Sequence, residues 1–273
     1  MRLILVLMAF LCPSLSMAQE DLPAPVKFGD GEITFARGED EEIAVSFKGL
    51  EIYRNYFVMV DRLVKVGSTD VALLLGGEGG NACAPATLII TQPEGSVDAK
   101  VEIVGEDCGS PPAAVGANEI LFVPFLVPGA KAKVESWTPE GGLAIKGEMA
   151  FLPKEGSSWA SLEPAKADHP FGLLDNADVY AATQELVGDK FSELMVVLGV
   201  SGQAEIIEGK YVAAPGCQAH ACGVANGFLG LDLEKKQVFA AVRNSGTETI
   251  FWPADIAVWP EPLMKAWEAS ITQ

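Results

Sequence analysis

The chain has 273 residues, 37 of them acidic and 19 basic, which gives a formal net charge of −18. Nucleic acids and anionic membrane surfaces repel such a chain, so its composition argues against both as partners. Its length is enough for two domains of ordinary size.

The N-terminus predicts a signal peptide over residues 1–18. Arg2 precedes an apolar run, Leu3–Cys12, which is too short to span a bilayer as a helix. Ser16 and Ala18 place small residues where cleavage after Ala18 requires them. We therefore expect export to the periplasm or the medium. Removal of Arg2 with this segment changes the net charge of the mature chain to −19.

Residues 19–152 have the pattern of an all-β domain, either a sandwich or a barrel, whose role the sequence does not assign. Short alternating or apolar runs are separated by glycine and proline clusters. The GGEGG segment lacks the Lys-Ser/Thr ending of a phosphate-binding loop, and we predict no cofactor. The expected strands are Glu32–Arg37, Glu42–Phe47, Tyr56–Val66, Asp70–Gly76, Ala86–Thr91, Val97–Gly105 and Lys131–Trp137.

Four cysteines remain in the mature chain, and an even number in an exported protein predicts two disulfides. Cys83 and Cys108 flank two expected strands that a hairpin would bring together. We therefore expect these two cysteines to pair, which would stabilise the domain by about 3 kcal/mol. The other pair is Cys217 and Cys222.

Residues 153–172 are rich in Pro, Gly, Ser and Ala and have no sustained period, which predicts a linker. Residues 173–273 then predict an α+β domain. Asp178–Gly199 has helical spacing, with Gly188 dividing it into two helices, and a last short helix begins at Pro260. Between them we expect an antiparallel five-stranded sheet formed by Ala204–Gly209, Lys210–Pro215, Asn226–Glu234, Gln237–Asn244 and Thr247–Trp252.

The segment PGCQAHACG, residues 215–223, gathers two cysteines and one of the chain's two histidines. Cys217, His220 and Cys222 are one ligand short of a structural zinc site, and His169 is far away in sequence, so we predict no metal. The Cys-x4-Cys spacing also differs from the Cys-x-x-Cys of thiol–disulfide exchangers. A hydrolase with His220 as its base needs partners that do not stand nearby, although distant partners stay open.

The remaining interpretation is a six-residue disulfide loop that joins two strands. The residues inside so small a ring cannot bury themselves and are expected to project; they are Gln218, Ala219, His220 and Ala221. The bridge stabilises by only about 2 kcal/mol, but it orders the loop before a partner binds. A stapled turn with a merely solvated histidine is the alternative.

The segment GKYVAAPGCQAHACGVANGFLGLDLEKKQVFAAV, residues 209–242, resembles the inhibitor of vertebrate lysozyme (Ivy) family. That family's hallmark is a strand, a protruding Cys-x-x-His-x-Cys-Gly loop and two strands joined by a short charged hairpin. The resemblance covers roughly residues 170–273. It implies a periplasmic, non-enzymatic inhibitor whose loop enters the lysozyme active-site cleft. By position, His220 would contact the two catalytic carboxylates there.

The loop departs from the better-known family members, which carry Lys-Pro before the histidine and Asp after it. Gln218, Ala219 and Ala221 occupy these positions here. The change motivates a rival function, an envelope binding module with the same fold retargeted to another ligand. Lysozyme, a basic muramidase, remains the expected partner, because a net charge of −19 attracts it. The sequence leaves open the lysozyme type and whether the chain forms a homodimer.

Overall fold

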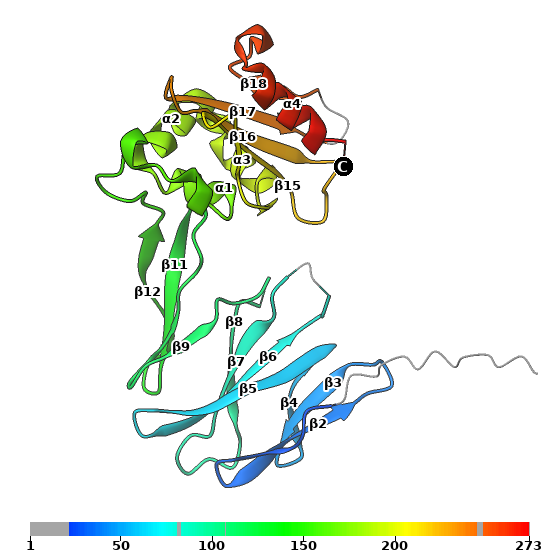
Figure 1. Ribbon diagram of the computed structural model, residues 1–273. Helices are drawn as coiled ribbons and strands as arrows, with labels where there is room; N and C mark the ends of the chain where they lie inside the picture. Colours follow the sequence, from blue (N-terminus) through cyan, green and yellow to red (C-terminus); the bar gives the residue numbers. More distant parts are fainter. Residues whose placement is uncertain (1–21, 81–82, 107, 245–247, 273) are drawn as a thin grey trace, which may run out of the picture. The chain divides into compact units, whose positions relative to one another are not determined.

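The computed structural model describes residues 22–80, 83–106, 108–244 and 248–272 (Figure 1). The expected signal peptide, residues 1–18 with cleavage after Ala18, lies outside these residues. No helix in the described ranges is long and apolar enough to cross a membrane. The chain divides into two compact units. The N-terminal unit comprises Met1–Lys65, Thr69–Gly79 and Pro85–Glu106, and the C-terminal unit comprises Val66–Ser68, Gly80–Ala84 and Asp107–Gln273.

The N-terminal unit is built from two four-stranded sheets, each with its strands in chain order. The first sheet contains β1 (Val26–Phe28), β2 (Gly31–Arg37), β3 (Ile43–Phe47) and β4 (Leu50–Asn55). The second contains β5 (Phe57–Val66), β6 (Thr69–Gly77), β7 (Ala86–Thr91) and β8 (Lys100–Val104). The prediction of a β-rich N-terminal region is therefore confirmed.

Alternating side chains join these two sheets in one core. Ile33, Val45 and Phe47 from the first sheet share a buried cluster with Leu74 and Leu88 from the second. Successive side chains of a strand point to opposite faces, so every second residue enters this cluster. β7 is buried along its whole length, which accounts for the apolar run Leu88–Ile90 at its centre.

A third four-stranded sheet, in the order β12-β11-β10-β9, is part of the C-terminal unit. Its strands are β9 (Ala113–Val115), β10 (Ile120–Phe122), β11 (Lys131–Thr138) and β12 (Gly142–Ala150). The expected disulfide between Cys83 and Cys108 is formed, with its two Cα atoms 4.9 Å apart.

The segment expected as a linker, residues 153–172, is ordered into short turns. It holds two 3-10 helices, Trp159–Ser161 and Pro164–Lys166, and the beginning of α1 (Pro170–Leu174). Trp159 and Leu162 pack against the helical core of the C-terminal unit.

The C-terminal sheet has six strands, which corrects the expected five. The strands are β13 (Val200–Ser201), β14 (Glu205–Ile207), β15 (Tyr211–Cys217), β16 (Asn226–Asp232), β17 (Gln237–Arg243) and β18 (Ile250–Trp252). The additional strand, β13, has only two residues, too few to produce a sequence pattern. It pairs with β15 along the same edge as β14.

Helices cover both faces of this sheet (Figure 1). One face packs against α1, α2 (Ala177–Val187) and α3 (Phe191–Val197), and the other against α4 (Glu261–Ser270). Asn176 begins α2, because its side-chain oxygen accepts from the N–H groups of Asp178 and Val179. Gly188 ends it with a φ of 62°, as the sequence predicted.

Candidate functional site

The candidate site is the loop between β15 and β16. These strands pair in antiparallel register from Tyr211 opposite Asp232 to Cys217 opposite Asn226. The loop therefore begins at the last residue of one buried strand and ends at the first residue of the next. The charged turn Glu234–Lys236 lies at the other end of the sheet, between β16 and β17.

A disulfide between Cys217 and Cys222 closes the loop, with their Cα atoms 4.9 Å apart. Backbone hydrogen bonds hold the loop from inside. The Gln218 N–H donates to the Ala225 carbonyl at 3.0 Å, and the Ala225 N–H donates to the Ala221 carbonyl at 2.8 Å. The ring is thus fixed both covalently and through its backbone.

The tip of the loop is a β-turn from Gln218 to Ala221. The Ala221 N–H donates to the Gln218 carbonyl at 3.0 Å, and His220 occupies the third position with a φ of +63°. A positive φ at the third position alone defines a type II turn, where glycine is the usual residue. A non-glycine residue in this region costs about 1 kcal/mol or more, and such residues cluster at functional sites.

Three of the four residues inside the ring are exposed: Gln218, Ala219 and His220. Ala221 is half-buried and packs against the core beneath α1–α3, which corrects the expectation that it projects. The turn reverses the chain through its two central residues, Ala219 and His220. One side of the ring therefore faces solvent and the other rests on the domain.

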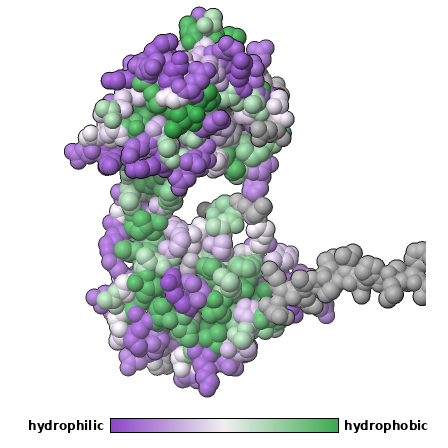
Figure 2. Space-filling view, in the orientation of Figure 1, coloured by the Kyte–Doolittle hydropathy of each residue, from purple (hydrophilic) through white to green (hydrophobic). Residues whose placement is uncertain are grey.

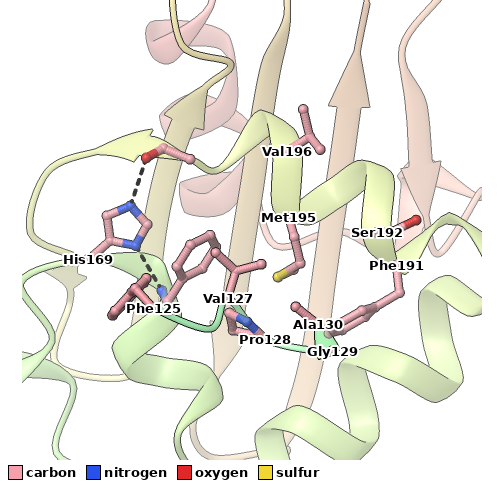
Figure 3. Close-up of a pocket in the computed structure, with 12 residues that line it drawn as sticks. Phe125, Val127, Pro128, Gly129, Ala130, His169, Phe191, Ser192, Met195 and Val196 are labelled. Carbon is pink, nitrogen blue, oxygen red and sulfur yellow. Dashed lines mark hydrogen bonds between the residues drawn. The ribbon is translucent and has the colours of Figure 1, made fainter. Parts of the chain in front are cut away.

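The second histidine lies elsewhere, in an apolar pocket of about 660 Å³ (Figure 3). The His169 Nδ1 accepts from the Phe171 N–H at 3.2 Å, and Nε2 lies 3.4 Å from the Gly199 carbonyl oxygen. Both ring nitrogens are therefore committed to backbone groups, and the other walls are mainly apolar, including Phe125, Phe191 and Met195. This pocket does not bring a second histidine to the disulfide loop.

The described residues contain no group of three His, Cys, Asp or Glu side chains that could hold a metal ion.

Figure 2 shows mainly hydrophilic residues on the drawn face of the part that carries α1–α4. His220 does not line the pocket of His169, nor either of two further clefts of about 400 and 460 Å³ in the C-terminal unit.

Sequence reasoning did not single out Asn226, which lies opposite Cys217 at the base of the loop. Its side chain is only 4% exposed. The available signal was its position, because it is a polar residue directly before the apolar run Gly227–Leu231.

Comparison with known proteins matches the chain in two parts. Residues 29–150 match the Y4bG N-terminal domain, and residues 178–273 match the inhibitor of vertebrate lysozyme (Ivy). The chain is also 27% identical over 236 residues to an uncharacterized protein, y4bG, of Sinorhizobium fredii (strain NBRC 101917 / NGR234). That alignment covers 84% of this chain and 85% of the relative. No solved structure matches the chain. The C-terminal domain, residues 178–273, is therefore a domain of the inhibitor of vertebrate lysozyme family.

Proposed function

We propose that the chain is an exported protein inhibitor of lysozyme that acts in the periplasm and is not itself an enzyme. In this proposal the Cys217–Cys222 loop enters the lysozyme active-site cleft with His220 at its tip. The match of residues 178–273 to an inhibitor family supports the class of function. The two disulfides fit an oxidising compartment.

The observation that carries the proposal is an exposed His220 at the tip of a stapled loop within an Ivy-type domain. Lysozyme cleaves its substrate between two carboxyl groups that flank the scissile bond. An imidazole inserted between them can donate a hydrogen bond to a carboxylate and occupy the place of the reacting sugar.

The geometry of the loop favours insertion into a partner over proton transfer to a bound substrate. The disulfide and the backbone hydrogen bonds order the ring before it binds, so little conformational entropy remains to be lost. Gln218 and Ala219 are exposed beside His220 and would contact the rim of the cleft. Ala221 would not contact the partner but would fix the ring by packing it against the core of its own domain.

The test is inhibition of lysozyme by the oxidised mature chain, residues 19–273, followed by the turbidity of a peptidoglycan suspension. Chicken-type and goose-type lysozymes are both measured. We expect inhibition of at least one type, and a loss of at least tenfold in the His220→Ala variant. Glu234→Ala is the matched control, because Glu234 is exposed in the turn at the other end of the sheet.

Inhibition that survives in His220→Ala would contradict the proposed role of the histidine. Failure of the unaltered chain to inhibit either lysozyme would contradict the proposed function. It would favour the rival, a binding module whose changed loop residues, Gln218, Ala219 and Ala221, serve another envelope ligand.

A further inference from the structure

A cleft of about 400 Å³ lies at the base of the disulfide loop. Both cysteines of the loop line it, together with Glu205 of β14, Asn226 of β16 and Ser270 in the last turn of α4. Its described lining residues include no Lys, Arg or His. The cleft is therefore continuous with the proposed inhibitory loop and has no cation in its walls.

One wall carries a buried hydrogen-bond acceptor that is not used. The Asn226 side-chain oxygen is buried and has no hydrogen-bond partner among the described residues. Leaving such an acceptor unpaired destabilises the domain. Strand alternation places Asn226 on the same face as Phe228, which packs against α4. The unpaired acceptor thus lies on the face that borders the cleft.

The other polar side chains that line the cleft, those of Ser270 and Glu205, also offer acceptors. The Ser270 hydroxyl already donates its proton to the Trp267 carbonyl at 2.7 Å, so its remaining capacity is that of an acceptor. Glu205 contributes an exposed carboxylate. The last turn of α4, a helix of 10 residues, adds the negative end of a helix dipole. These walls complement a ligand that carries positive charge and several N–H donors.

We infer that this cleft binds the guanidinium group of an arginine on the protein that the loop engages. The acceptors come from three separate elements, and a guanidinium presents five N–H donors in one plane, whereas an ammonium is a compact point charge. The inference rests on the proposed function for the partner's identity. The chemistry of the cleft can nevertheless be measured without any lysozyme.

Arg243, a cation next to one wall of the cleft, provides a further control. Arg243 stands opposite Asn226 in β17 and is half-buried, but it does not line the cleft and leaves the Asn226 oxygen unpaired. Its charge opposes the entry of a second cation. Replacement by glutamine, as in Arg243→Gln, is therefore expected to strengthen the binding of a guanidinium.

The experiment titrates N-ethylguanidinium into the oxidised mature chain and follows the NMR shifts of the Asn226 side-chain amide and the Gly223 backbone amide. N-ethylurea is the neutral probe of matched shape. We expect saturable shifts with the cation and at least tenfold weaker binding of the urea. Glu205→Gln should weaken the binding of the cation several-fold. Asn226→Leu should abolish it and raise the midpoint of thermal unfolding, because the unpaired acceptor is removed.

Equal binding of the two probes, or unchanged binding of the cation in Glu205→Gln, would overturn the inference. Glu205 is exposed, so this variant keeps the test valid even where Asn226→Leu fails to fold. In the lysozyme assay, full inhibition by Asn226→Leu alongside loss in His220→Ala would reject an arginine at this cleft. That result would leave the proposed function standing.

Discussion

Gly216 and Gly227 lie directly opposite each other in β15 and β16, at the base of the disulfide loop. The end of α3 packs on this pair. A Cβ on Gly227 would lie 2.7 Å from the Val197 carbonyl oxygen, and a Cβ on Gly216 would lie 2.9 Å from the Leu198 Cα. Because these are backbone atoms, they cannot rotate away from an added methyl group. The glycine pair lets a helix rest on the strands that position the loop.

Gly227→Ala is therefore expected to lower the free energy of unfolding by about 1–3 kcal/mol, the usual cost of overpacking. Urea denaturation of the oxidised mature chain measures the change. The matched control is Gly202→Ala, because a Cβ on Gly202 meets no atom within 4 Å. That control should leave stability unchanged or raise it by up to about 1 kcal/mol. Equal stability of the two variants would show that α3 does not need the glycine.

Ala219→Pro should strengthen inhibition by ordering the turn. Ala219 is the second residue of the type II turn, where proline is favoured, and within the described residues its N–H donates no hydrogen bond. Proline there reduces the entropy of the unfolded chain, and we expect a gain in stability of about 0.4–1 kcal/mol. The dissociation constant for lysozyme, measured by calorimetry, should fall several-fold.

Ala221→Pro serves as the opposite case for the same loop. The Ala221 N–H closes the turn onto the Gln218 carbonyl, and proline removes that donor. Stability and inhibition should both fall. A gain in affinity from Ala221→Pro, or a loss from Ala219→Pro, would contradict the assignment of the turn.

The sequence predicted the broad layout because apolar periodicity and glycine positions decide it. Gly188 ends α2, and the short apolar runs of β15 to β17 were visible as strands. β12 was not, because its residues are largely exposed on both faces and show no apolar face. β13 is defined only by its hydrogen-bonded pairing with β15, and the sequence of two residues does not predict such a pairing.

The candidate site was predicted in part for a similar reason. Cysteine count and spacing identify a stapled loop with His220, since these depend on covalent chemistry. The half-buried state of Ala221 and the unpaired oxygen of Asn226 depend on what packs beneath the ring. Such packing arises from residues far apart in the chain, including α4, and local sequence does not encode it.

Removal of each disulfide should lower the stability of the chain, but only removal of the Cys217–Cys222 bridge should weaken inhibition. Replacing Cys217 and Cys222 together by serine should lower the free energy of unfolding by about 2 kcal/mol and weaken inhibition at least tenfold. Replacing Cys83 and Cys108 should cost about 3 kcal/mol and leave inhibition unchanged, because that bridge lies outside the Ivy-type domain. Unfolding curves and inhibition constants are measured for both double variants. Intact inhibition without the smaller ring would refute the need for a pre-ordered loop.

The acidity of the chain predicts fast, salt-sensitive association with a basic lysozyme. A net charge of −18, or −19 after removal of Arg2, produces a field that attracts a positively charged partner. The association rate constant should therefore fall steeply as ionic strength rises, while the dissociation rate constant changes little. Stopped-flow mixing at increasing salt concentrations measures both. An association rate independent of salt would show that the acidity does not steer binding.

Glu193 of α3 should make the stability of the domain depend on pH. A hydrogen bond from Lys190, at 2.9 Å, is the main cause that lowers the pKa of Glu193, and a second from the Asn244 side chain, at 2.6 Å, adds to it. A carboxyl group whose pKa is lowered by folding stabilises the folded state above its unfolded pKa. That contribution is lost as the pH falls through the folded pKa.

Glu193→Gln should therefore lower the free energy of unfolding by about 1 kcal/mol at pH 7, since the pair is partly exposed. The difference from the unaltered chain should begin to shrink as the pH falls below about 4, the pKa of the carboxyl group in the unfolded chain. It should vanish below the lower pKa of the folded state, where both states bind the proton. Denaturation curves across this range measure it. Glu185→Gln, at an exposed position of α2, is the control for a general loss of negative charge. A difference that stays constant from pH 7 to pH 3 would show that Glu193 acts through packing rather than through its charge.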